Sequence, residues 1–170
     1  DFCKYPRTWV SPTAEPGRLM LEVNTASSGI NLQRFKDTML KDMPYEHLNE
    51  DAAQRGLPER NLPGMYAVFL TGMHLDQDLL TGGFVMSNPI SVDTKPEDYF
   101  HALTLNIGMS ISMCIEKMKT LQPLEHDYLI GCGGGFSSPV VGQTVADLTG
   151  LKVRIFDNWR EATVYGGYVL

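Results

Sequence analysis

The chain has 170 residues, of which 43% are hydrophobic and 20% charged, and its mean hydropathy is −0.14. This length is typical of one domain, and the composition is that of a water-soluble protein that buries a core, which excludes a disordered chain. Fourteen basic and twenty acidic residues give a formal net charge of −6, the wrong sign for a surface that binds nucleic-acid phosphates or anionic lipids. We therefore expect one folded domain with no nucleic-acid partner and no membrane partner.

The cysteines and the two ends of the chain suggest where the protein works. Cys3, Cys114 and Cys132 are widely spaced and form no CxxC pair, so neither a disulfide framework nor a zinc knuckle is encoded. The N-terminus has no basic segment followed by an apolar one, and no stretch reaches about 18 uninterrupted apolar residues. We expect a cytoplasmic protein. Because the chain lacks an initiator methionine and stops at Leu170 inside a helical pattern, we also expect a piece of a longer protein.

The first half of the chain is predicted to contain short strands and amphipathic helices. A proline-rich opening, expected to be a loop or edge strand, leads into a strand over Arg18–Thr25. Apolar residues at three- and four-residue steps predict a helix over Gly29–Asp42, and a more polar helix follows over Pro44–Arg55. The apolar stripe of the first helix consists of Leu32, Phe35, Met39 and Met43. Met65–Leu70 is nearly continuously apolar, as in a buried strand, and no element is assigned over Gly72–Pro89.

The second half of the chain has clearer periodicity. Lys95–Thr120 is the longest helical candidate, and its apolar residues occupy most of the helix circumference, which predicts a buried central helix. After it come a strand over Tyr128–Cys132, a helix over Pro139–Thr149, a strand over Val153–Phe156 and a helix from Glu161 onward. This alternation is typical of a parallel βαβ unit and predicts the α/β class.

A glycine-rich loop connects the first strand of this βαβ unit to its helix. Gly133, Gly134 and Gly135 follow the first strand and precede a helix with Ser138 at its cap and Pro139 in its first turn. Residues without a Cβ let a ligand approach the main chain, and the free N–H groups of a helix N-terminus attract an anion. One glycine would satisfy a tight turn with positive φ, so three in a row favour a loop that binds a nucleotide or phosphate.

Two kinds of nucleotide loop can be compared with this segment. It is not a P-loop, because no Lys-Ser or Lys-Thr follows the glycines. A dinucleotide fingerprint fits imperfectly: Gly133 and Gly135 have the right spacing, Ser138 stands where the third glycine belongs, and Asp157 follows at about the distance of a ribose-binding acid. A Rossmann-like module that binds NAD or FAD therefore remains an alternative, although such units normally begin their domain.

Other polar residues give weaker indications. Gly29 at a helix start can admit a ligand to the backbone, and Gln33, one turn along, offers both a donor and an acceptor. The four histidines lack the spacing of a metal site; they are His47, His74, His101 and His126. No GxSxG elbow is present, so Ser137 and Ser138 are interpreted as helix caps and not as nucleophiles.

These segments together resemble a known family. The pattern GGG-x-x-SP-x-x-x-Q-x-x-AD-x-x-GL-x-V from Gly133 to Val153, followed by Glu-Ala-Thr at Glu161, resembles the C-terminal half of the FGGY carbohydrate kinases. Upstream, the segment from Gly29 to Gln33 is similar to the family's glycine-to-glutamine helix start. The resemblance covers most of the chain from about Leu19.

The resemblance implies a fold and a binding site. The family has the fold of actin-like ATPases, in which two lobes of ribonuclease-H type close over ATP and sugar. Residues 1–170 would be the second, C-terminal lobe, an α/β unit with a mixed sheet flanked by helices. Its residues would line the adenosine and α-phosphate side of the site. The expected nucleotide-binding residues are Gly29, Gln33, Gly133, Gly134, Gly135 and Ser138.

The resemblance also implies what the chain lacks. The parent protein would transfer the ATP γ-phosphate to a sugar hydroxyl, and its aspartate base and magnesium-binding acids would lie on the preceding lobe, so we expect this chain alone to be inactive. The sequence departs from the family at Met73 and His74, where Glu-Arg is usual, and at His101 and Leu105, where Arg and Glu are usual. A catalytically inactive relative, kept for assembly or nucleotide sensing, is therefore a further alternative, and homodimer formation is left open.

Overall fold

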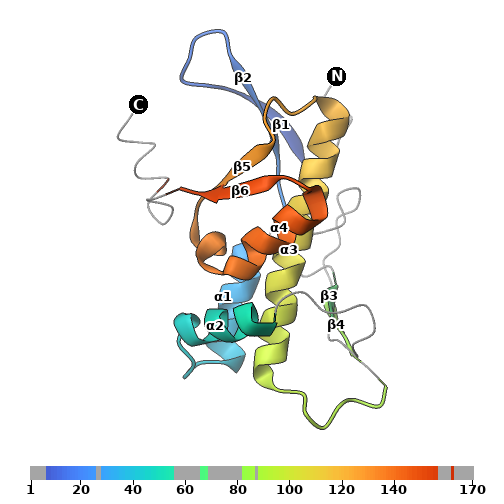
Figure 1. The fold of residues 1–170 in the computed structure, drawn as a ribbon. Helices are drawn as coiled ribbons and strands as arrows, with labels where there is room; N and C mark the ends of the chain where they lie inside the picture. The colour runs from blue at the N-terminus through green and yellow to red at the C-terminus, as the bar shows by residue number, and fades with distance from the viewer. Residues whose placement is uncertain are drawn as a thin grey trace.

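The computed structural model describes residues 7–25, 28–55, 66–68, 82–86, 88–156 and 162. Figure 1 shows a long helix, α3 (Pro96–Leu121), with the other helices and the strands arranged around it. The side chains of α3 between Phe100 and Ile115 are buried on several faces, which confirms the predicted central helix. Met113, at 40% exposure, is an exception to the predicted burial.

Helix α3 is stabilised at both ends and along its buried faces. At its start the main-chain N–H of Lys95 donates to Asp98 Oδ2 at 2.7 Å, and at its end Gln122 N–H donates to Met118 O at 2.9 Å. Hydroxyl groups inside the core return to the helix backbone, as in the bond from Thr104 Oγ1 to Phe100 O at 2.8 Å. The buried hydroxyls of α3 are therefore tolerated because the preceding turn of the helix satisfies them.

Helices α1 (Ser28–Met39) and α2 (Tyr45–Arg55) pack against the first half of α3. Their shared core consists of Leu40, Leu48 and Phe100, with Leu32, Phe35 and Met43 packed around it. Three of the four residues of the predicted stripe are thus confirmed. Met39 was predicted to be buried and this was wrong, because α1 ends there with Met39 65% exposed, and Leu40 takes the buried position.

Helix α4 (Pro139–Thr149) crosses α3 at close range. A Cβ on Gly108 of α3 would lie 2.6 Å from Thr144 Cβ of α4, so only glycine allows this approach. Val141 and Val145 of α4 are buried, at 0% and 1% exposure. Gly150, with φ of +69°, ends the helix in the left-handed conformation and donates its N–H to Ala146 O at 2.9 Å.

The strands before and after α4 form the predicted parallel unit. Strand β5 (Tyr128–Gly131) pairs in parallel with β6 (Lys152–Ile155), and Leu129 lies opposite Val153. Figure 1 shows α4 and α3 on one side of this pair. The helix expected from Glu161 lies outside the described residues, apart from Ala162, which is helical.

The remaining strands form two antiparallel pairs. Strand β1 (Thr8–Pro12) pairs with β2 (Leu19–Val23). Strand β3 (Tyr66–Val68), within the predicted strand Met65–Leu70, pairs with β4 (Gly83–Val85), which lies where no element was assigned. Instead of the single mixed sheet that was expected, the described residues form three two-stranded sheets. No ladder of hydrogen bonds joins β1–β2 to β5–β6 within these residues, so each pair has unpaired edges.

Candidate nucleotide site

The glycine loop leaves β5 and enters α4 through a tight 3-10 turn, η2 (Gly134–Ser137). Gly131, at the end of β5, packs against the ring of Phe136, where an added Cβ would lie 2.8 Å from the ring carbons. Gly133 has φ of +87°, a conformation that side chains of L-residues rarely adopt. The close approach at Gly131 and the backbone conformation at Gly133 therefore explain why these two positions are glycine.

Neither reason applies to the next two glycines. Gly134 and Gly135 are exposed, have no positive φ, and would place an added Cβ in open space with no other atom within 4 Å. Phe136 N–H donates to Gly133 O at 3.1 Å, whereas the amides of Gly134 and Gly135 donate to no backbone oxygen among the described residues. The main chain at these two residues is therefore open to a ligand.

The two serines after the glycines have different surroundings. Ser137 Oγ donates to Gly134 O at 2.7 Å and so caps the 3-10 turn. Ser138 occupies the N-cap position of α4, but the prediction that its side chain caps the helix was wrong, because no side-chain cap bond forms. Its side chain is only 2% exposed, and in the part of the chain that the structure describes Ser138 Oγ has no hydrogen-bond partner. The residue lines a second, smaller pocket of about 300 Å³.

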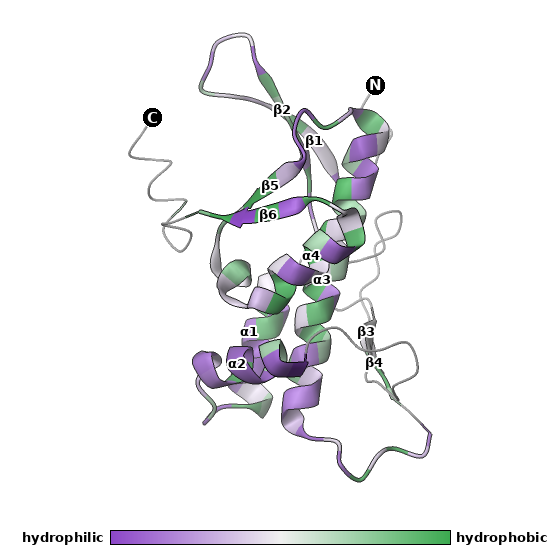
Figure 2. Ribbon diagram, viewed as in Figure 1, coloured by the Kyte–Doolittle hydropathy of each residue, from purple (hydrophilic) through white to green (hydrophobic). Residues whose placement is uncertain are grey.

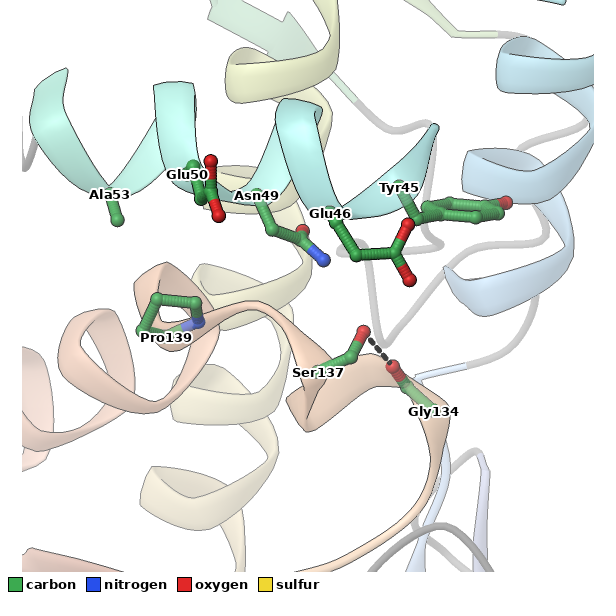
Figure 3. A pocket seen from close by; sticks show the side chains of 8 residues that line it. All are labelled: Tyr45, Glu46, Asn49, Glu50, Ala53, Gly134, Ser137 and Pro139. Carbon is green, nitrogen blue, oxygen red and sulfur yellow. Dashed lines mark hydrogen bonds between the residues drawn. The ribbon is translucent and has the colours of Figure 1, made fainter. Parts of the chain in front are cut away.

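A pocket of about 550 Å³ lies between helix α2 and the glycine loop. Figure 3 shows the side chains of Glu46 and Asn49 on α2 directed toward the turn that follows β5. The residues that line it are Tyr45, Glu46, Asn49, Glu50 and Ala53 from α2, and Gly134, Ser137 and Pro139 from the loop and the start of α4. This volume is within the range of small-molecule sites, about 300–1,000 Å³.

Sequence reasoning missed the contribution of α2. Glu46, Asn49, Glu50 and Ala53 follow the i, i+3, i+4, i+7 spacing of one helix face, and this is the signal that could have found them. Figure 2 shows most of α2 as hydrophilic, which suits a solvated surface helix equally well. Only the approach of the glycine loop, from far along the chain, turns this polar face into the wall of a pocket.

Arg55 fixes the end of α2 against α3. Its Nε donates to Asp51 Oδ2 at 2.6 Å within α2, and its Nη1 donates to Asp98 Oδ1 at the start of α3. Burial by itself would lower the pKa of Arg55, but the hydrogen bonds and charges of Asp51 and Asp98 raise it above its ordinary value. The guanidinium therefore stays charged and links the pocket wall to the central helix.

The other predicted site residues do not line this pocket. Gly29 and Gln33 are on an exposed face of α1, and open space surrounds Gly29, but neither residue is among those that line the pocket. Gly133 and Gly135 are in the loop beside it and are not among the lining residues either. The structure therefore places α2 opposite Gly134, whereas the prediction placed Gly29 and Gln33 of the first helix there.

Of the positions at which the sequence departs from the family pattern, Leu105 lies in the core. Leu105, where the family usually has a charged residue, is buried with Ala52 and Val140 between α2, α3 and α4. Met73, His74 and Asp157 lie outside the described residues.

Within the described ranges no three or more His, Cys, Asp or Glu residues are placed to hold a metal ion together. None of the described helices has the length and apolarity to cross a membrane.

Comparison with known proteins identifies the family. Residues 48–170 match the C-terminal domain of the FGGY family of carbohydrate kinases. The chain belongs to this family. It is also 27% identical over 165 residues to a Bacillus subtilis (strain 168) protein named "Putative sugar kinase YoaC", and this alignment covers 96% of the chain and 33% of that relative. The chain thus spans about a third of the length of this relative.

The family assignment confirms the resemblance found in the sequence. The matched range contains most of α2, all of α3 and α4, and the glycine loop. Gly29 and Gln33 precede the range. The segments that form the pocket are therefore mostly within the FGGY domain.

Proposed function

We propose that this chain is the ATP-binding lobe of a sugar kinase that transfers the ATP γ-phosphate to a carbohydrate hydroxyl. The FGGY family and the relative named as a sugar kinase support the reaction class. The observation that carries the nucleotide assignment is the pair Gly134 and Gly135, because neither packing nor backbone conformation requires glycine there. A ligand that approaches the main chain at these positions would explain them.

The loop suits an anionic group. The N-terminus of α4 lies directly after η2, and a helix N-terminus carries roughly half a positive elementary charge. The amides of Gly134 and Gly135, which have no backbone acceptor among the described residues, can donate to phosphate oxygens, as helix N-termini do in many phosphate sites. The adjacent pocket of about 550 Å³ has room for the rest of a nucleotide. The described residues therefore fit an adenine nucleotide.

Catalysis is proposed to need a second lobe. Phosphoryl transfer depends on positioning and charge stabilisation, and bound magnesium would neutralise charge on the phosphates. The catalytic base, the magnesium-binding acids and most sugar contacts are proposed to lie on that lobe. In this proposal the present chain holds and orients the nucleotide, and by itself it transfers no phosphate.

Equilibrium binding tests this function. We expect isothermal titration of the 170-residue chain to show ADP binding, and NADH to bind more weakly or not at all. Gly134→Val should weaken ADP binding, because the added side chain occupies the space in front of the loop. Gly83→Val is the matched control, since Gly83 also faces open space but is in β4, away from the pocket.

Two results would overturn the proposal. Binding of NADH without ADP would favour the Rossmann-like alternative and contradict the kinase assignment. Equal ADP affinity for Gly134→Val and the unmodified chain would remove Gly134 from the site. If neither nucleotide binds and the chain self-associates, the inactive relative kept for assembly becomes the better account.

A further inference from the structure

We propose that Leu105 is a positioning residue, whose side chain sets the distance between α2 and the start of α4 and so the width of the pocket between them. This inference rests on the proposed function, because the pocket is taken to hold a nucleotide. Leu105 does not line the pocket itself. The FGGY family usually has a charged residue at this position, so a packing role here is not one that the family pattern describes.

Leu105 joins three helices next to the pocket. It is 4% exposed and forms one buried cluster with Ala52 of α2 and Val140 of α4. Ala52 is adjacent in sequence to Ala53, which lines the pocket from α2. Val140 is adjacent to Pro139, which lines it from the start of α4. Since Figure 3 shows Ala53 and Pro139 on opposite sides of the pocket, the cluster connects two facing parts of its wall.

Helix α2 has few other buried anchors. The structure describes its whole length, and its buried residues are Leu48 and Ala52. Leu48 packs with Leu40 and Phe100, beside α1. Ala52 is therefore the buried residue of α2 that belongs to the cluster with α4. Because tertiary packing of the apolar face supplies most of the stability of a surface helix, this contact decides where α2 lies relative to α4.

Arg55 fixes α2 at a second point, against α3. It bonds Asp51 on α2 itself and Asp98 at the start of α3. Asp98 lies seven residues, or about two turns, before Leu105 and so on the same face of α3. The ion pair and Leu105 therefore hold α2 along one line of α3. Of these two attachments, Leu105 is the one that also packs against α4.

The volume of the Leu105 side chain controls the separation of the walls. Protein interiors are close-packed, so a shorter side chain leaves a void that the surrounding helices close only in part. Closing the void moves α2 and α4 together, and keeping it loosens the contact between them. Either response changes the pocket, whereas methionine, which has a similar volume, should largely keep it.

Isothermal titration with ADP of the 170-residue chain and its Leu105→Ala and Leu103→Ala variants tests this role. Leu103 is the matched control, because it is also buried on α3, at 2% exposure, but is not in the cluster with Ala52 and Val140. Side chains two residues apart on a helix point about 200° apart, so the two leucines are on opposite sides of α3. Both variants should unfold at lower urea concentrations than the unmodified chain, since each loses most of a buried leucine side chain.

Only Leu105→Ala should also lose affinity for ADP. If the pocket keeps its width in about a tenth of the molecules, ADP binds about tenfold more weakly. Leu103→Ala should stay within about twofold of the unmodified chain, as expected for a site without shared partners. Leu105→Met should restore the affinity. Should an alanine variant fail to fold, Leu105→Val and Leu103→Val make the same comparison with a smaller void, and an affinity loss of about threefold is expected for Leu105→Val alone.

The outcomes separate this inference from the proposed function. If the unmodified chain does not bind ADP, the proposed function fails and the role of Leu105 fails with it. If ADP binds but the variants of Leu105 and Leu103 lose affinity equally, or neither loses any, the nucleotide assignment stands and the positioning role is wrong. Binding by Leu105→Met as weak as that by Leu105→Ala would also overturn it, because side-chain volume would then not be the cause.

Discussion

Alanine substitutions at Gly131, Gly133 and Gly134 should separate glycines that the fold requires from a glycine that a ligand requires. At Gly131 an added Cβ meets the Phe136 ring at 2.8 Å and Ile155 Cδ1 at 3.0 Å, so overpacking should cost about 1–3 kcal/mol. At Gly133 the backbone has φ of 87° and ψ of 167°, a region used almost only by glycine, and alanine should cost about 1–3 kcal/mol. At Gly134 the space is open and φ is not positive, so alanine should change the unfolding free energy by about 0–1 kcal/mol, in the stabilising direction.

Urea unfolding at 25 °C, followed by circular dichroism, measures these differences for each variant. Titration with ADP then measures the affinity of each variant. Gly134→Ala should bind ADP more weakly although its unfolding free energy is kept. The matched control is Gly83→Ala, which has open space around it and lies in β4. If Gly134→Ala proves as destabilising as Gly133→Ala, the reasoning is refuted, because the fold itself would then require the residue.

Three further changes test the framework around the pocket. Arg55→Met should lower the unfolding free energy by about 1 kcal/mol and weaken ADP binding, because it removes the bonds to Asp51 and Asp98 that hold α2 against α3. Unchanged ADP affinity would show that α2 needs no such link. Gly108→Ala should lower the unfolding free energy by about 1–2 kcal/mol, since the close contact with Thr144 outweighs a helix-propensity gain of about 1 kcal/mol. A variant that is more stable in urea unfolding would contradict the close crossing of α3 and α4. Burial raises the pKa of the Cys114 thiol, so the unfolding free energy should fall as pH rises above about 8.5, where the unfolded chain releases a proton that the folded chain keeps. In urea unfolding at a series of pH values, Cys114→Ala should lack this fall. A fall of the same size in both proteins would contradict the prediction.

Local periodicity predicted the elements that dominate the fold. Helix α3 is 26 residues long with apolar residues on most faces, and this pattern has no competing strand interpretation. The β5–α4–β6 unit was predictable because its strands, glycines and caps alternate at short range. Strand β4 was missed because it has only three residues, and a run that short has no usable period. Met39 was misplaced because it is the last residue of α1, and Leu40, just after the helix ends, takes the buried position instead.

The candidate site was predictable only in part. The glycine loop has a local signature, because strand, glycines and helix are adjacent in sequence. The face of α2 that lines the pocket has no such local signature. Glu46 and Asn49 look like ordinary surface residues in the sequence, and only the fold places Gly134 opposite them. Ser138 was misjudged because a serine in an N-cap position normally bonds to the helix, and packing here turns its hydroxyl inward.

In the proposed site the amides of Gly134 and Gly135 receive the phosphates of an adenine nucleotide. Backbone amide NMR of the isotope-labelled 170-residue chain, titrated with ADP, observes these groups individually. We expect the amide signals of Gly134 and Gly135 to show the largest shifts and to follow one saturable curve with the signals of α2. Saturation with ADP that leaves both glycine amides unmoved, while other regions shift, would contradict it.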